Sequence, residues 1–188
     1  QNVAHKNALQ ALQRKVIRTS FAEQAYLHLI EQLKKQIRAI DTEVRRLIES
    51  DPTFKEMLLL LLSVPGVGLL LASHFILLAQ FSLEYKLLAS FLGIAPHEHS
   101  SGTSVYKPAT SRHFGPPAIR KLLYLAACSV CTHRPQFRTY LARKTQQGKP
   151  ARLVLNNVEN KLIRIMCAVL SSKTAFIESY HSVQPLAL

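Results

Sequence analysis

Apolar residues follow a helical spacing through the first fifty positions of the chain. The series runs from Leu9 to Val16 and again from Tyr26 to Leu47, at alternating steps of three and four residues. This narrow seam predicts a helix that packs against another helix, as in a coiled coil. Ser20 followed by Glu23 has the spacing of a capping box and could start a second helix there. One long helix and a helical hairpin both fit residues 1–51, and we favour a coiled coil between two copies of the chain.

Beyond Asp51 the apolar spacing stays helical, but proline and glycine break it repeatedly. Pro52 suits the first turn of a new helix. Residues 93–117 are dense in Ser, Thr, His, Pro and Gly, which predicts a loop with at most a short extended piece at 104–106. The helices predicted on either side span residues 54–63, 69–80, 82–92, 117–133, 135–147 and 151–173.

We therefore expect an all-α, mainly helical fold. Residues 1–51 would form a coiled coil or helical hairpin for dimerisation, residues 52–173 a compact helical domain, and residues 174–188 a weakly ordered tail. The almost wholly apolar stretch 57–79 imitates a membrane span. Because Pro65–Gly68 divides it into runs too short to cross hydrocarbon as helices, we expect no transmembrane helix.

The distribution of charge indicates a polyanionic partner. The chain has 24 Lys and Arg against 11 Asp and Glu, for a formal net charge of +13 and a pI near 10.0. From Lys107 to Arg164 there are twelve basic residues and a single acid, Glu159, so this stretch holds +11 of the total. Nucleic acid is the first candidate for the partner and an acidic membrane surface the second.

The three cysteines give no sign of a disulfide framework or a metal site. Their number is odd, and Cys128 and Cys131 lack the second pair that a zinc site with this spacing requires. We interpret them and Cys167 as small buried residues of a protein in a reducing, cytosolic compartment.

A turn with two glycines lies between the predicted helices 54–63 and 69–80. The sequence Val64-Pro65-Gly66-Val67-Gly68 resembles a helix-hairpin-helix motif. Such a turn leaves backbone N–H groups uncovered at a helix N-terminus, where a phosphate binds favourably. The alternative is a turn that only joins two packed helices. The basic stretch downstream favours the phosphate contact.

The predicted loop contains a candidate nucleophile, Ser101, followed by Gly102. Glycine lets a DNA backbone approach closely, and arginines can hold a phosphate and stabilise charge on its oxygens. The basic residues that follow are Lys107, Arg112 and Arg120. A serine nucleophile needs a proton acceptor, which His97, Glu98 or His99 could provide. The same His-Glu-His run hints at a metal, but without a third ligand a solvated loop is the simpler interpretation.

The order of these segments carries the most information. They are Leu61-Leu62-Ser63-Val64-Pro65-Gly66-Val67-Gly68, Phe91-Leu92-Gly93-Ile94-Ala95-Pro96, Ser101-Gly102, Gly115, Ile119 to Ala127, Gly148-Lys149-Pro150 and Asn160-Lys161-Leu162. In this order the chain resembles the insertion-sequence transposases that have an N-terminal DEDD, RuvC-like nuclease domain and a C-terminal serine-bearing domain. That family includes the pilin-gene-inverting recombinases and the bridge-RNA-guided recombinases. The resemblance covers residues 50–172, and the helical segment before them matches the family's coiled-coil region more loosely.

The resemblance implies a role for individual residues. Ser101 would be the nucleophile that forms a phosphoserine link to DNA, with Ser100 as second choice, and Arg120 would contact the phosphate or the transition state. Lys149 and Lys161 match basic positions of the family and would touch the DNA backbone. The turn, the loop and the distribution of charge add further expected DNA contacts: Pro65, Gly66, Gly68, Gly102, Lys107, Arg112, Lys121 and Arg152. The chain departs from the family pattern at Phe114 and Pro116-Pro117, where Arg112 and His113 could substitute.

The resemblance also implies what the chain lacks and what it binds. The acidic metal ligands belong to the nuclease domain, so we expect no metal or other cofactor in this chain and no activity from it alone. The expected partners are DNA, a guide RNA as a second candidate, and another copy of the chain in a homodimer or higher oligomer, in the cytoplasm near the nucleoid and away from membranes. The alternative function is a non-catalytic helix-hairpin-helix module for DNA binding and dimerisation. A coiled-coil adaptor without affinity for nucleic acid is the third hypothesis.

Overall fold

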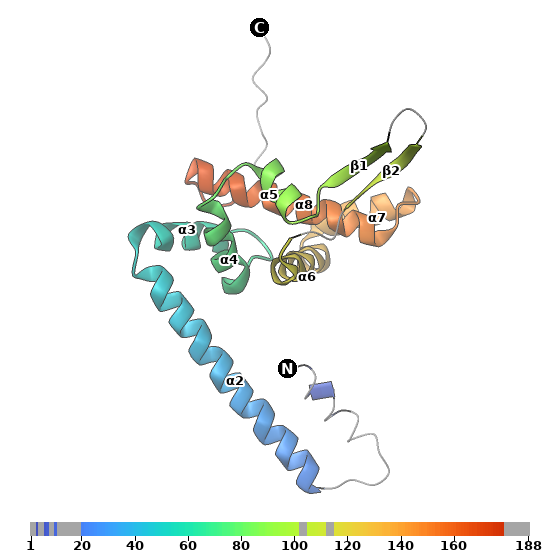
Figure 1. Ribbon diagram of the computed structural model, residues 1–188. Helices are drawn as coiled ribbons and strands as arrows, with labels where there is room; N and C mark the ends of the chain where they lie inside the picture. Colours follow the sequence, from blue (N-terminus) through green and yellow to red (C-terminus); the bar gives the residue numbers. More distant parts are fainter. Residues whose placement is uncertain are drawn as a thin grey trace. The chain divides into compact units, whose positions relative to one another are not determined.

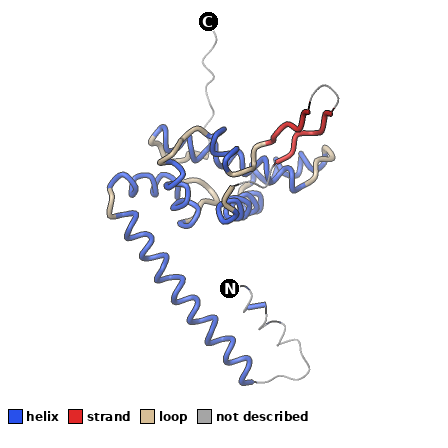
Figure 2. The backbone as a smooth tube through the Cα atoms, in the orientation of Figure 1, coloured by secondary structure: helices blue, strands red, loops and turns tan. Residues whose placement is uncertain are grey.

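The structure is a computed structural model, and it describes residues 3, 6–7, 10, 20–101, 105–111 and 115–178. Residues 97–101 and 105–111 are described by their backbone alone. The chain divides into two compact units, Gln1–Glu49 and Ser50–Leu188. Figure 1 labels their helices and strands, and Figure 2 distinguishes the two strands from the helices.

The first unit contains the long helix α2, Ser20–Glu49. It begins where the sequence predicted a helix start, and it is supported by ion pairs one turn apart, Arg46 with Glu43 at 2.6 Å and Arg45 with Glu49 at 3.6 Å. Its apolar seam is largely exposed within this unit. The exposed members beyond the middle of the helix are Ile37 at 44%, Ile40 at 60% and Leu47 at 55%.

The second unit opens with two helices of 11 residues, α3 (Pro52–Leu62) and α4 (Leu69–Ala79). The Asp51 carboxylate caps α3 by accepting hydrogen bonds from the backbone N–H groups of Thr53 at 2.7 Å and Phe54 at 3.2 Å, and Pro52 occupies the first turn. The turn between α3 and α4 interrupts the apolar stretch. Within the part of the chain that the structure describes, none of the helices has both the length and the apolar character needed to cross a membrane.

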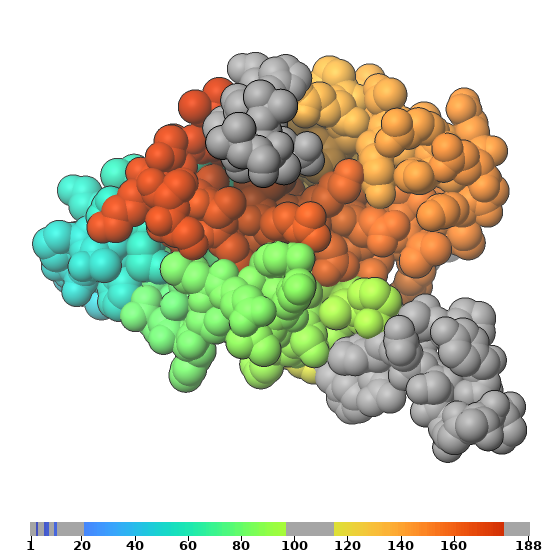
Figure 3. Space-filling view, turned by 90° about the horizontal axis from the view of Figure 1, so that it is seen from above, coloured from blue at the N-terminus to red at the C-terminus, as the bar shows by residue number. Residues whose placement is uncertain are grey.

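Helix α8 (Ala151–Ser172) is the centre of the second unit. It packs against α3, α5 (Tyr85–Phe91), α6 (Pro117–His133) and α7 (Pro135–Gln146). Figure 3 shows α8 lying between α5 and α7 on one face of the unit. The largest fully buried side chains come from α3, α4, α6 and α8 and from the segments that follow α3 and α5: Phe75, Leu58, Leu61, Leu92, Ile94, Leu123, Leu162, Ile163, Met166, Val64, Val130 and Val154. The mainly helical fold class predicted from the sequence is confirmed.

The loop predicted for residues 93–117 proved wrong over most of its length. Strand β1 (Pro96–Ser101) pairs antiparallel with β2 (Val105–Ser111) and forms a hairpin that leaves the helical body (Figure 2). The register changes between His97, opposite Thr110, and His99, opposite Lys107, so Pro108 falls in the bulge. Proline has no N–H to donate to a ladder, and a bulge is a place where a strand tolerates it. Pro108 is therefore compatible with the hairpin, although proline in the sequence favoured a loop.

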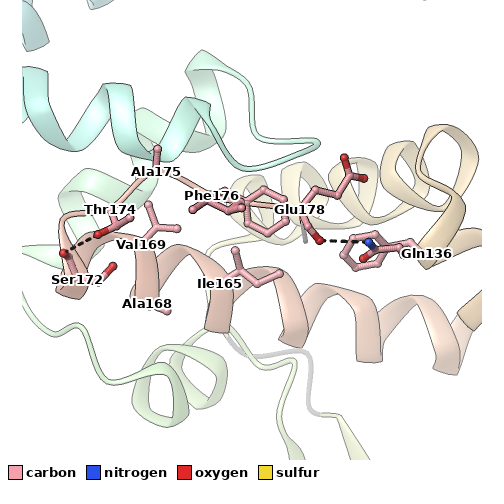
Figure 4. Close-up of a pocket in the computed structure, with 11 residues that line it drawn as sticks. Gln136, Ile165, Ala168, Val169, Ser172, Thr174, Ala175, Phe176 and Glu178 are labelled. Atoms are coloured by element: carbon pink, nitrogen blue, oxygen red, sulfur yellow. Dashed lines mark hydrogen bonds between the residues drawn. The ribbon is translucent and has the colours of Figure 1, made fainter. Parts of the chain in front are cut away.

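The segment after α8 lies along that helix and reaches α7 (Figure 4). The backbone N–H of Phe176 donates to Ser63 Oγ at 2.8 Å, Gln136 Nε2 donates to the carbonyl of Glu178 at 3.2 Å, and Arg134 pairs with the Glu178 carboxylate at 3.4 Å. The tail predicted for 174–188 is thus held by hydrogen bonds as far as residue 178, and the remainder lies outside the described residues.

Candidate nucleic-acid interface

The two glycines of the α3–α4 turn have different surroundings. Gly66 has φ +80°, and a Cβ there would lie 2.7 Å from Val130 Cγ1 and 3.0 Å from the carbonyl oxygen of Ala126. This glycine therefore lets the turn pack against α6. Gly68 is exposed, has open space where a Cβ would be, and caps α4 without a side-chain hydrogen bond. The N–H groups that a helix leaves unpaired in its first turn follow directly after it.

The hairpin is anchored to the helical body at the start of β1. Asn156 Nδ2 and Asn160 Nδ2, both from α8, donate to the carbonyl oxygen of Ile94 at 3.0 Å each. On the other side, Gly115 follows β2 with φ +89°, and a Cβ there would overlap the carbonyl oxygen of Phe91. These contacts fix both ends of the hairpin against α5 and α8. Ser101 is the last residue of β1, and its backbone lies opposite Val105. Its side chain lies outside the described atoms.

Cations of α7 and α8 lie over tyrosine rings near this anchor. The Lys161 ammonium is 3.5 Å from the centre of the Tyr140 ring, and the Arg164 guanidinium is 4.5 Å from that of Tyr85. Burial and, after it, the positive charges of Arg143, Lys144 and Arg164 lower the pKa of Lys161. Among the described residues, the cations from 138 to 164 have no carboxylate within ion-pair distance. The sequence assigned this charge to a stretch from Lys107 to Arg164 with Glu159 as its one acid. The geometry agrees for these cations, but Arg134, in the same stretch, pairs with Glu178 at 3.4 Å.

A second cluster surrounds the one acid of the basic stretch. Glu159 is 6% exposed and is the buried charged residue in the described core. Its burial raises the pKa to about 7, against the attraction of Arg120 on α6 and Arg152 on α8, which lowers it. The pKa of the Tyr124 phenol on α6 is raised as well. Its hydrogen bond with Cys128 is the largest cause, and the charge of Glu159 is a smaller one. The structure thus brings Arg120 and Arg152, both predicted to contact DNA, around one buried carboxyl group.

Among the cavities that border α8 in the described part of the chain, two differ clearly in chemistry. One, of about 520 Å³, lies between α7, α8 and residues 174–178, and its lining is mostly apolar (Figure 4). The other, of about 390 Å³, lies between α5, the start of β1 and α8. Its lining contains three cations and no carboxylate: Tyr85, Lys86, Ala89, Ala95, Pro96, Asn157, Asn160, Lys161 and Arg164. We call this second cavity the cationic pocket, and it suits an anion better than the apolar cavity does.

Six of the predicted site residues fall into three places. Arg120 and Arg152 both act electrostatically on Glu159, Lys161 lines the cationic pocket, and Gly66 and Gly68 lie in the α3–α4 turn with Pro65. Lys121 and Lys149 are exposed on α6 and before α8. Lys107 is placed by its backbone in β2, whereas Gly102 and Arg112 lie outside the described residues.

Sequence reasoning missed several members of the interface. Arg164 and Lys86 were not assigned a contact, although Arg164 was counted in the basic stretch, and Tyr85 and Tyr140 gave no signal before the helices were packed together. The amide pair Asn156 and Asn160, spaced four residues apart on one helical face, was the signal that could have been found. In the described part of the chain no three of His, Cys, Asp and Glu are placed to hold a metal ion, and the cysteines are free.

Comparison with known proteins finds similarity to one family over part of the chain. The sequence model of the family described as "Transposase IS116/IS110/IS902 family" matches residues 58–142, from α3 through the turn and the hairpin to α7. The resemblance to insertion-sequence transposases, predicted from the order of the motifs, is confirmed.

Individual relatives agree with this class. The chain is 28% identical over 149 residues to a "Pilin gene-inverting protein" of Moraxella lacunata, covering 77% of this chain and 46% of the relative. It is 29% identical over 148 residues to the "Insertion element IS110 uncharacterized 43.6 kDa protein" of Streptomyces coelicolor, covering 77% and 35%. It is 27% identical over 157 residues to a "Probable family 20 transposase" of Pseudomonas aeruginosa, covering 79% and 46%. The chain therefore spans less than half the length of these relatives.

Proposed function

We propose that this chain is the DNA-handling, serine-bearing part of a DNA transposase or site-specific recombinase. The observation that carries the proposal is the match of residues 58–142 to a transposase family, because these residues include the hairpin with Ser101 and helix α6 with Arg120. The unneutralised cations of α7 and α8 and the exposed N-terminus of α4 support contact with a DNA backbone.

The proposed chemistry is a transesterification at a DNA phosphodiester. The Ser101 hydroxyl oxygen attacks phosphorus and forms a new P–O bond, and the bond from phosphorus to one sugar oxygen breaks. The serine proton passes to a base, for which His97, Glu98 and His99 on β1 are the candidates, and the leaving sugar oxygen gains a proton. Arg120 would stabilise negative charge on the non-bridging oxygens. In strand exchange a different sugar hydroxyl attacks the phosphoserine and releases the serine. The phosphoserine bond therefore conserves the energy of the broken DNA phosphodiester bond.

This chemistry would need further groups outside the chain. We place the divalent metal in the N-terminal nuclease domain of the complete protein, which makes this chain inactive by itself. A dimer through α2 would bring two serines to one pair of DNA sites, and the exposed seam of Ile37, Ile40 and Leu47 supports such pairing.

The test uses the complete protein with supercoiled DNA that carries its recombination site. Ser101→Ala should abolish the covalent protein–DNA adduct, measured as labelled DNA that migrates with denatured protein, and should leave DNA affinity unchanged. Ser100→Ala, one residue earlier on β1, is the matched control and should retain the adduct. If adduct is lost with Ser100→Ala and kept with Ser101→Ala, the nucleophile is Ser100. If both variants form it, the hairpin is not the catalytic element, and the chain acts as a binding module.

A further inference from the structure

The cationic pocket lies at the foot of the hairpin that carries the proposed nucleophile. Three cations enter it from two helices: Lys86 from α5, and Lys161 and Arg164 from α8. Asn157 lies one turn before Lys161 and adds an amide donor to the same wall. Lys86, Lys161 and Arg164 have no carboxylate within ion-pair distance among the described residues, so the pocket holds a surplus of donors and positive charge.

The cations of the pocket are oriented before any ligand arrives. Tyr140 holds the Lys161 ammonium at 3.5 Å and Tyr85 holds the Arg164 guanidinium at 4.5 Å from their ring centres. A cation that lies over a ring face keeps N–H donors that point away from the ring, because the ring attracts its positive charge and does not accept a directed hydrogen bond. Preorganised donors lose less conformational entropy on binding an anion.

We propose that the cationic pocket binds a backbone phosphate of the same DNA strand that Ser101 attacks, and so positions the scissile phosphate at the end of β1. This inference rests on the proposed function. The lowered pKa of Lys161, caused by burial and by neighbouring positive charges, agrees with a site that a phosphate would neutralise.

The hairpin geometry sets how far the two phosphates are from each other. Strand β1 runs from Pro96, in the pocket wall, to Ser101. Its six residues cover about 17 Å at about 3.3 Å per step. One strand of duplex DNA carries a phosphate about every 3.4 Å along the helix axis. The phosphate in the pocket should therefore lie within about five nucleotides of the scissile one.

Variants of the complete protein test the pocket through DNA affinity and its salt dependence. Lys161→Gln and Arg164→Gln should each weaken binding to site DNA by about tenfold, because each removes a hydrogen bond from a charged donor. The slope of log K against log salt should become shallower by about one for each phosphate that the variant no longer binds. Arg164→Lys keeps the charge and should retain the slope. Lys55→Gln, an exposed cation on α3 outside the pocket, is the matched control and should change affinity little.

A neutral phosphate analogue locates the phosphate that the pocket binds. Methylphosphonates placed singly along the cleaved strand should weaken wild-type binding at one position within about five nucleotides of the cut, and Arg164→Gln should show no further weakening there. Equal affinities of Lys55→Gln and Arg164→Gln for site DNA would overturn the proposal that the pocket binds a DNA phosphate. The proposal would also be overturned if Arg164→Gln weakened binding to RNA of the same sequence and left binding to DNA unchanged. Adduct formation by the wild type and none by Ser101→Ala would leave the proposed function intact in either case. Conversely, a salt-slope change without any adduct supports the pocket and rejects the chemistry.

Discussion

Removal of the buried carboxyl group of Glu159 should abolish a pH dependence of stability. The group is 6% exposed, and Arg120, Arg152 and Tyr124 are the charged or titratable groups that act on it. Burial raises its pKa from the ordinary 4.5 to about 7. Between these two values the folded chain binds more protons than the unfolded chain does, so the free energy of unfolding falls as pH rises through that window.

The size of the effect follows from the same two values. At about 1.4 kcal/mol per pH unit, a pKa of about 7 in place of 4.5 costs the folded chain about 3 kcal/mol once the carboxyl group is ionised. Part of this cost is already present at about pH 5, so about 2.5 kcal/mol should develop between about pH 5 and about pH 8.5. Glu159→Gln removes it, because an amide of the same shape stays neutral at every pH.

The assay is urea unfolding of wild type and Glu159→Gln across this pH range, followed by circular dichroism. The variant should match the wild type most closely at the acid end and exceed its stability by a margin that grows from about pH 5 to about pH 7 and then levels off. Glu56→Gln removes an exposed carboxylate from α3 and controls for the change in net charge. A constant difference between wild type and Glu159→Gln across the range would refute the reasoning, since the buried carboxyl group would then not change protonation on folding.

Two further predictions concern packing and assembly. At Gly66 a Cβ meets α6 and φ is +80°, at Gly148 φ is +78° with open space around it, and at Gly68 neither constraint applies. Alanine should therefore lower the free energy of unfolding by about 4 kcal/mol at Gly66, by about 1–2 kcal/mol at Gly148 and not at all at Gly68. Urea titration of the three variants measures these losses, and equal losses would contradict the assignment. In the proposed dimer, Ile40→Glu should raise the dissociation constant at least about 100-fold, whereas Ala39→Glu, one residue off the seam, should not. Sedimentation equilibrium measures both constants. An unchanged dissociation constant for Ile40→Glu would exclude α2 as the interface.

The helices of this chain could be predicted from the sequence because their signals are local. Pro52, Pro117 and Pro135 each stand in the first turn of a helix, and glycines or prolines end most of the helices near the predicted positions. Leu58 and Phe75, on the helices predicted for residues 54–63 and 69–80, are fully buried. These features depend on the backbone within a few residues and need no knowledge of tertiary contacts.

The hairpin and the cationic pocket could not be predicted in the same way. Strand β2 has polar residues and Pro108 inside it, so neither alternation nor composition indicates a strand, and its pairing with β1 depends on anchors at Ile94 and Gly115. The pocket needs Lys86 from α5 beside Arg164 from α8, 78 positions later in the sequence. Charge counting located the basic stretch, but only the packing of α5 on α8 separates the cations that share one pocket.

Two groups of cations beside α8 have neighbours of different chemistry. Arg120 of α6 and Arg152 of α8 act on the carboxyl group of Glu159, which is largely neutral below about pH 7 and then offsets little of their positive charge. In the pocket, Lys161 and Arg164 face tyrosine rings, which orient the cations without neutralising them. Both arrangements keep positive charge on the helix that holds the hairpin through Asn156 and Asn160. A phosphate that binds there is positioned by the element that also fixes the start of β1, so that DNA position and hairpin position are set together.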